Sequence, residues 1–286
     1  MSDQPDLVAL FPWLAEHAAT AIRLNPAPSA SPLAPAASKI GGRFLWPAEV
    51  AWPVCTARET APVPSEEEFG ALAALWEGAH PGEDAAALVQ RFAEHARALR
   101  QQHHESYRPL VQLRRDEFPT FPFPGEADIF QLFWCPQPHI ATPAHIAIWR
   151  REKDAGSIAS RQVEAPEHGL APEPVTEYPM SVEFETSFRR ELDEKLTGAA
   201  MRVTAGGVRR LMTGSQYYDD TLSVVRGSKL FGYVRWKSDP GNARCDCGRP
   251  MGLLLTVSAE EASQDLLVFW CPVCPGPKLR SYVQTL

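Results

Sequence analysis

The residues whose types and spacing best suggest chemistry are four cysteines near the C-terminus. They form a Cys-x-Cys pair and a later Cys-x-x-Cys pair: Cys245, Cys247, Cys271 and Cys274. Two apolar runs between the pairs, 253–257 and 266–270, would form strands that bring one pair back against the other. Four thiolates complete a tetrahedral zinc site and leave no position open for catalysis. The spacing therefore predicts a structural zinc ribbon, with two disulfides, four free thiols or a redox-active Cys-x-x-Cys as alternatives.

Two other segments of the sequence occur twice and in the same order. SKIGGRFLW at 38–46 recurs as SKLFGYVRW at 228–236, and DIFQLFWCP at 128–136 recurs as DLLVFWCP at 265–272. Repeats that keep their order indicate a duplicated structural unit. We therefore expect the two FWCP segments to occupy equivalent strands in two similar, β-rich halves.

The first copy carries an incomplete set of metal ligands. Cys55 follows a Trp-Pro dipeptide, Cys135 aligns with Cys271, and His139 comes shortly after it. These three side chains predict at most a degenerate metal site, Cys55/Cys135/His139. The alternative is that both thiols are buried and behave as small hydrophobic groups.

Composition restricts the class of protein. The chain has 286 residues, a net charge of −7, 44% hydrophobic residues and 22% charged residues. These values are typical of a soluble globular protein with one large or two small domains, and they argue against a general nucleic-acid or anionic-membrane surface. No run is long and apolar enough for a membrane helix, and the acidic, amphipathic N-terminus is unlike a signal peptide. Six cysteines, four of them in metal-site spacing, favour a cytoplasmic location.

The expected architecture is α+β and β-rich, with duplicated β-barrel or sheet units, helical inserts and the C-terminal zinc ribbon. Apolar residues three and four apart predict a helix over 5–24. The expected divisions are an N-terminal helix with a proline-rich connector (1–37), a first half (38–150) with a helical insert (65–104), a linker (151–180), and a second half with the ribbon (181–286).

Several aromatic residues adjoin prolines in the predicted loops. They are Trp46, Trp52, Phe118, Phe121 and Phe123. Aromatic side chains are favoured as interface residues, so these five predict a surface for a protein partner. The alternative is that they close the ends of the β-rich units as part of the core.

A catalytic constellation is harder to find in the sequence. No G-x-S-x-G, H-E-x-x-H or phosphate-loop motif occurs. Lys39 and Lys229 occupy equivalent positions of the repeat, which raises the alternative of an enzyme with a site between the halves, drawing also on Glu49 and Asp239. The acidic pair Asp219-Asp220 is better suited to a solvated turn.

In these motifs the chain resembles the YwqG-like family of bacterial proteins of unknown function, and its zinc-ribbon half is similar to the programmed cell death protein 2 family. The matching positions are Gly232, Trp236, Cys245, Cys247, Met251, Leu253–Leu255, Phe269, Cys271 and Cys274. The pattern departs from the family in three ways: the first half lacks two cysteines, Thr256 replaces the glutamine that Gln112 keeps, and Cys-x-Cys replaces Cys-x-x-Cys.

The resemblance implies a duplicated β-rich fold. On the eukaryotic side it implies a chaperone or adaptor that binds a client protein, and on the bacterial side a family without established chemistry, some members of which are suspected of toxin–immunity roles. The expected function is a non-enzymatic, zinc-stabilised, chaperone- or adaptor-like protein with an unidentified protein partner. The alternatives are the enzyme with Lys39 and Lys229, and a toxin–immunity protein.

Overall fold

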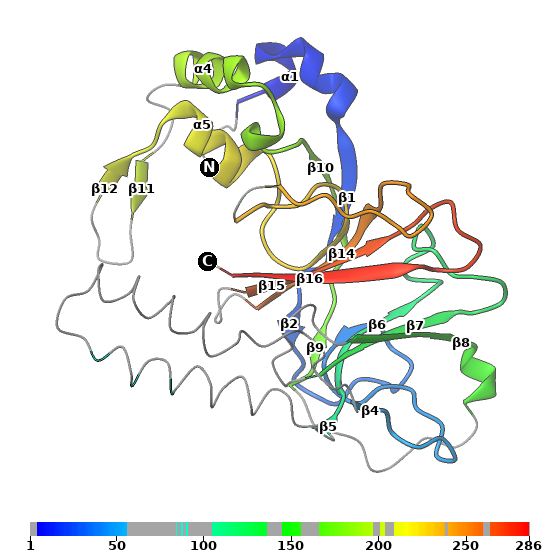
Figure 1. Ribbon diagram of the computed structural model, residues 1–286. Helices are drawn as coiled ribbons and strands as arrows, with labels where there is room; N and C mark the ends of the chain where they lie inside the picture. The colour runs from blue at the N-terminus through cyan, green and yellow to red at the C-terminus, as the bar shows by residue number, and fades with distance from the viewer. Residues whose placement is uncertain are drawn as a thin grey trace.

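Two six-stranded antiparallel sheets make up most of the part of the protein that the structure describes (Figure 1). The computed structural model describes residues 5–55, 84, 87, 90, 105–135, 145–155, 166–196, 201–203, 209–237, 240–259 and 264–285. The N-terminal sheet has the order β2 (Ala27–Pro28), β9 (His168–Gly169), β3 (Lys39–Ile40), β6 (Arg108–Arg114), β7 (Ile129–Trp134) and β8 (His145–Arg150). The C-terminal sheet has the order β10 (Glu173–Glu177), β1 (Ala19–Arg23), β13 (Lys229–Phe231), β14 (Gly252–Ala259), β15 (Gln264–Trp270) and β16 (Leu279–Thr285). The predicted α+β, β-rich class is confirmed.

Four strands follow the same order and the same register in the two sheets, β3-β6-β7-β8 in one and β13-β14-β15-β16 in the other. Lys39 on β3 pairs with Gln112 on β6, and Lys229 on β13 pairs with Thr256 on β14. Each second strand then has one irregularity at the matching place, between Pro109 and Val111 in β6 and between Leu253 and Leu255 in β14. A β-bulge re-aims the residues around it, so its repetition indicates a shared backbone course and not merely a shared strand count.

The FWCP segments occupy equivalent strands, as the repeat predicts. Phe133 on β7 lies opposite Pro109, and Phe269 on β15 lies opposite Leu253. In each sheet the cysteine that follows comes directly after the end of this strand. Cys135 and Cys271 therefore hold equivalent positions.

Two segments far apart in the sequence cross from one sheet to the other. Residues 19–28 place β1 in the C-terminal sheet and β2 in the N-terminal sheet, and residues 168–177 do the same with β9 and β10. The backbone between the strands stays paired, since the N–H of Ala171 donates to the carbonyl oxygen of Leu24 over 2.9 Å. Neither sheet is therefore built from its own half of the sequence alone.

These crossing strands correct two predictions. The helix expected over 5–24 is limited to α1 (Leu7–Leu10) and a 3₁₀ turn, η1 (Pro12–His17), because Pro12 cannot continue the α-helical hydrogen bonding. The β-branched residues Thr20 and Ile22 then continue into β1. The region expected as a linker, 151–180, contains η2 (Glu152–Asp154), β9 and β10.

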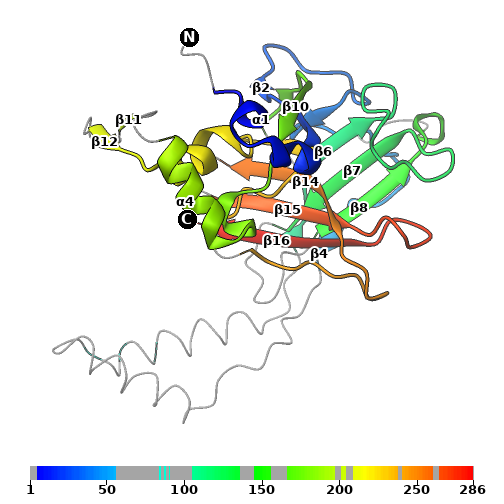
Figure 2. The ribbon, with the colours of Figure 1, turned by 90° about the horizontal axis from the view of Figure 1, so that it is seen from above.

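The inner faces of the two sheets share one hydrophobic core. It contains Val111 and Leu132 from the N-terminal sheet and Leu255 and Val268 from the C-terminal sheet, each with no exposed surface. Seen from above, β6, β7 and β8 lie beside β14, β15 and β16 (Figure 2). Burial of these branched side chains is the main force that holds the sheets together.

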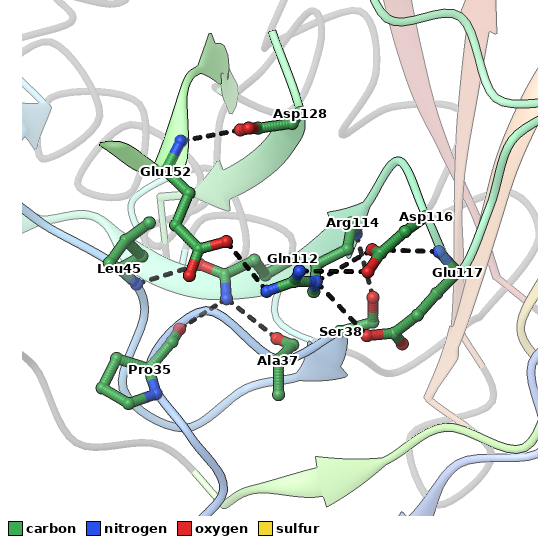
Figure 3. Close-up of polar contacts among 10 residues, drawn as sticks. All are labelled: Pro35, Ala37, Ser38, Leu45, Gln112, Arg114, Asp116, Glu117, Asp128 and Glu152. Atoms are coloured by element: carbon green, nitrogen blue, oxygen red, sulfur yellow. Dashed lines mark hydrogen bonds and ion pairs between the residues drawn. The ribbon is translucent and has the colours of Figure 1, made fainter. Parts of the chain in front are cut away.

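One side-chain amide organises the N-terminal sheet from within. Gln112 has no exposed surface, and its Nε2 donates to the carbonyl oxygens of Pro35 and Ala37 over 2.6 and 2.8 Å (Figure 3). Its Oε1 accepts from the N–H of Leu45 over 2.9 Å. At the matching position of the C-terminal sheet, the Oγ1 of Thr256 is buried and has no hydrogen-bond partner among the described residues. The glutamine thus fixes the proline-rich connector to the sheet.

A separate helical cluster packs at the edge of the C-terminal sheet (Figure 1). It combines α1 and η1 with the following elements: η3 (Ser181–Glu183), α4 (Thr186–Lys195), α5 (Gly214–Tyr217) and η4 (Tyr218–Leu222). Its core contains Phe11, Phe188 and Tyr218. The short strands β4 (Val54–Cys55), β5 (Glu105–Ser106), β11 (Met201–Val203) and β12 (Arg209–Leu211) complete the described elements. Apart from three positions, the predicted insert 65–104 lies outside the residues that the structure describes. None of the helices in the described residues is long and apolar enough to cross a membrane.

Candidate metal centre

The four C-terminal cysteines come together at one end of the C-terminal sheet. Their sulfur atoms all lie within 4.8 Å of one another. The Sγ atoms of Cys245 and Cys274 are 3.6 Å apart, and those of Cys247 and Cys271 are 3.7 Å apart. Cys271 directly follows β15, and Cys245 stands in the loop before β14. The two predicted strands do bring one cysteine pair against the other, and the set can hold a metal ion.

A tight turn presents the first cysteine pair. The N–H of Cys245 donates to the carbonyl oxygen of Arg249 over 2.9 Å, and the N–H of Gly248 donates back to Cys245 over 2.8 Å. Gly248 has a φ of 80°, which a residue with a side chain rarely adopts. The turn therefore needs this glycine to hold Cys245 and Cys247 over the second pair.

The electrostatics of the cluster favour one thiolate and resist more. The backbone N–H of Val273 points at the sulfur of Cys271 and lowers the pKa of that thiol to about 7. The contact with Cys245 raises the pKa of the Cys274 thiol to about 12. Four sulfurs at these distances cannot all ionise without a cation between them, and metal binding would release their protons.

Apolar side chains pack beneath the four-cysteine cluster. Cys245 and Cys271 are buried in a cluster with Met251, Leu267 and Phe269. Cys247 is exposed and Cys274 is half-buried. The outer side of the centre therefore meets solvent while the inner side is continuous with the outer face of the sheet.

The N-terminal half has an incomplete counterpart of this centre. Val54 pairs with Ser106 in β4 and β5, as Arg244 pairs with Pro250 in the other half. This register aligns Cys55 with Cys245. Where three residues, 246–248, separate Cys245 from Arg249, the N-terminal half has the long segment 56–104 between Cys55 and Glu105. The tight turn that carries Cys247 thus has no short equivalent in that half.

Cys55 and Cys135 do lie in one cluster, as the aligned register requires. Both are buried with Trp46, Tyr107 and Phe133. Burial, followed by the contact with the Cys55 sulfur, raises the pKa of the Tyr107 hydroxyl. His139, the third predicted ligand of a degenerate site, lies outside the described residues.

We expect the N-terminal pair to bind no metal, because the described residues of this cluster offer two buried thiols among aromatic rings, which is half of a tetrahedral site. Replacing Cys55 with serine should then leave the metal content of the purified protein unchanged. Elemental analysis of wild type and Cys55→Ser would measure this. Two metal equivalents in the wild type, falling to one in the variant, would contradict the expectation.

The equivalent lysines of the repeat are buried, and each forms an ion pair with a glutamate. The Nζ of Lys39 is 3.0 Å from the Oε1 of Glu167, and that of Lys229 is 2.6 Å from the Oε1 of Glu177. The exposed fractions of the lysine side chains are 0% and 1%. Each ammonium also donates to a backbone carbonyl oxygen, that of Ala34 and that of Tyr233 respectively. Burial lowers the pKa of both amines, to about 8 for Lys229. These contacts account for both lysines within the fold.

A glycine at the same repeat position makes room for each glutamate. Gly42 and Gly232 have φ values of 69° and 70°. A Cβ on Gly42 would lie 2.5 Å from a carboxylate oxygen of Glu167, and a Cβ on Gly232 would lie 2.1 Å from one of Glu177. Sequence reasoning matched the lysines and glycines but missed both glutamates, because they fall in the segment predicted as a linker.

The other acidic candidates also have structural partners. Asp219, predicted in a solvated turn, accepts from the backbone N–H and the hydroxyl of Ser181 over 2.6 Å each, and burial raises its pKa. Asp220 pairs with Arg235 over 2.6 Å. Glu49 is exposed, and Asp239 lies outside the described residues. The structure therefore does not bring Glu49 to the lysines.

The predicted aromatic interface is wrong for three of these side chains, which are buried in the core. Trp46, Phe118 and Phe121 are 3%, 1% and 3% exposed. Trp52 and Phe123 are half-buried, each packed against a core cluster. The prolines beside them direct the chain so that the rings point inward, where they bury apolar area. The alternative interpretation, in which these residues close the ends of the β-rich units, is the one the structure supports.

Comparison with known proteins adds no relative to these observations. Neither the protein-family models nor the curated proteins give a match to this chain.

Proposed function

We propose that this chain is a protein-binding protein whose C-terminal sheet is stabilised by a structural zinc ion on Cys245, Cys247, Cys271 and Cys274. The observation that carries the proposal is the four-sulfur cluster. Tetrahedral zinc with Zn–S bonds of about 2.3 Å requires sulfurs about 3.8 Å apart. The Cys245–Cys274 and Cys247–Cys271 sulfur separations are 3.6 and 3.7 Å, whereas a disulfide would need about 2.05 Å.

The ligand set supports a structural role for the ion. Four thiolates fill the coordination of zinc, so no position remains for a bound water or substrate. The ion would connect the turn at Cys245–Cys247 to the turn after β15. Its binding energy would therefore appear as stability of this end of the sheet.

Exposed apolar residues near the centre support the binding role. Val273, between the two later cysteines, is 61% exposed, and Tyr282 and Val283 on β16 are 37% and 40% exposed. β16 is an edge strand, with β15 as its one partner in the described sheet. Apolar side chains gathered near one edge are typical of contact surfaces for other proteins. The resemblance to client-binding adaptors agrees with this interpretation.

The experiment is partner capture with the intact protein. Tagged wild type and tagged Cys274→Ser would be used as baits, with chemical cross-linking in the native cells, and the recovered partner would be purified and mixed with each bait. We expect a defined complex with wild type and at least a tenfold weaker one with the variant. Wild type that forms no complex, or that turns over a small molecule in an activity screen, would overturn the proposal.

A further inference from the structure

A pocket opens on the outer face of the C-terminal sheet, beside the metal centre. Its volume is about 220 Å³, and it lies between β15, β16 and the loop before the first cysteine pair. Trp236, Phe269 and Tyr282 form much of its wall. The ring of Phe269 meets that of Tyr282 edge-on at 5.7 Å, and Gly241 covers the ring of Trp236 closely enough that a Cβ would lie 3.4 Å from it. The pocket is thus aromatic and narrow.

The N-terminal half has the same place filled by one of its own side chains. Trp46 and Phe133 are the repeat equivalents of Trp236 and Phe269. The indole ring of Trp52 lies against both, with its centroid 5.3 Å from that of Trp46 and 5.5 Å from that of Phe133. Its Nε1 donates to the carbonyl oxygen of Tyr107 over 2.8 Å, so the ring is fixed in orientation.

The register places Asn242 at the position of Trp52. Equivalent hydrogen bonds align the residues that follow these two, Pro53 and Ala243. The N–H of Tyr107 donates to the carbonyl oxygen of Pro53 over 3.0 Å, and the N–H of Met251 donates to that of Ala243 over 2.9 Å. The C-terminal half therefore keeps the aromatic walls but replaces the indole between them with a short amide. The pocket is the space that this replacement leaves.

We propose that this pocket receives an aromatic side chain, a tryptophan above all, from the protein partner, and that the side chain takes the position that Trp52 takes in the N-terminal half. The proposal rests on the proposed protein-binding function and names the group that is recognised. The volume suits one ring system, since a cavity of about 150 Å³ binds benzene and drug-sized sites begin at about 300 Å³. Tryptophan is also one of the side chains enriched among the residues that dominate interface energetics.

The chain's own sequence supplies the probe. Residues 49–54 read EVAWPV and carry Trp52 in its native surroundings. A peptide of this sequence would be titrated into ¹⁵N-labelled full-length protein, beside a control peptide with alanine in place of tryptophan. We expect chemical-shift changes concentrated at 241–243, 267–269 and 282–284, and at least a tenfold weaker interaction with the control peptide. Equal shifts with both peptides, or shifts elsewhere, would overturn the proposal.

Filling the pocket from within is the decisive variant. Asn242→Trp should place an indole where Trp52 lies in the other half, abolish binding of the peptide and raise the melting temperature. The matched control is Leu211→Trp, which adds the same ring at a side chain 64% exposed and outside the pocket and should bind the peptide as wild type does. If Asn242→Trp does not fold, Tyr282→Ala removes a wall instead and should weaken binding at least tenfold. Peptide binding unchanged in the folded variant would overturn the proposal.

The pocket proposal and the protein-binding proposal can fail independently. A native partner that binds Asn242→Trp as tightly as wild type would overturn the pocket proposal and leave the function intact. A wild type that captures no partner, while still binding the tryptophan peptide at the pocket, would overturn the function and support the pocket.

Discussion

Replacing Cys245 with serine should release the metal ion and unfold the outer end of the C-terminal sheet. Cys245 is buried and connects its tight turn to Cys274 across the centre. Structural zinc contributes apparent binding free energies of about 10–16 kcal/mol in isolated zinc-finger peptides, and part of that energy becomes folding energy. In this larger fold we expect a loss of several kcal/mol of stability, on the scale of the whole stability of a typical protein. Elemental analysis and thermal unfolding would measure both effects.

Hydrogen exchange would show where the loss occurs, and Cys55→Ser provides the control. Cys55 is buried and aligned with Cys245, but it lies in the half with the incomplete ligand set. Exchange in Cys245→Ser should rise first at 240–259 and 271–285, while exchange in β6 and β7 should stay close to that of wild type. A variant that keeps one metal equivalent and melts as wild type does would contradict the assignment of the centre.

The four-cysteine cluster and the repeat could be predicted from sequence because both depend on the local spacing of residues. Cysteine pairs flanking two apolar runs define their own hairpin, and the FWCP segments share a strand whose position the pleat determines. The aligned cysteines Cys55 and Cys245 were also within reach of the sequence, since the offset between Trp46 and Trp236 continues unchanged to them. The long segment 56–104 interrupts the sequence pattern directly after Cys55, so this match was missed.

Local sequence patterns could not predict the strands that cross between the sheets. Ala19–Arg23 has apolar residues that fit a helix as well as a strand, and its strand state depends on pairing with β10 and β13, distant in the sequence. The segment with β9 and β10 contains prolines and acids that indicate coil. The structural role of its glutamates depends on a buried lysine from another strand that lies beside each of them. Long-range pairing and burial, and not propensity, decide both cases.

Replacing Glu177 with glutamine should be the most damaging single change outside the metal centre. It would leave the ammonium of Lys229 buried without its counter-charge, and side-chain exposures of 1% and 0% show that water screens neither partner. Removal of one partner of a buried ion pair costs about 3–5 kcal/mol, because the remaining charge keeps its desolvation penalty. Both carboxylate oxygens are in use, since Glu177 also accepts from the N–H groups of Val225 and Tyr233. Chemical denaturation of wild type and variant would measure the difference.

The double variant Glu177→Gln with Lys229→Met is the matched control, because it removes the orphaned charge and should recover most of the loss. The pH dependence gives a second check. Burial already lowers the pKa of Lys229 to about 8, and losing the carboxylate that raises it would lower it further. Between the lowered pKa of Lys229 in the variant and about pH 8, the folded variant therefore binds fewer protons than the folded wild type. Its deficit in stability should therefore narrow as pH rises toward about 8 and stay constant above. A deficit that is independent of pH over this range, and unrelieved by Lys229→Met, would show that Glu177 stabilises the fold through its backbone contacts and not through the ion pair.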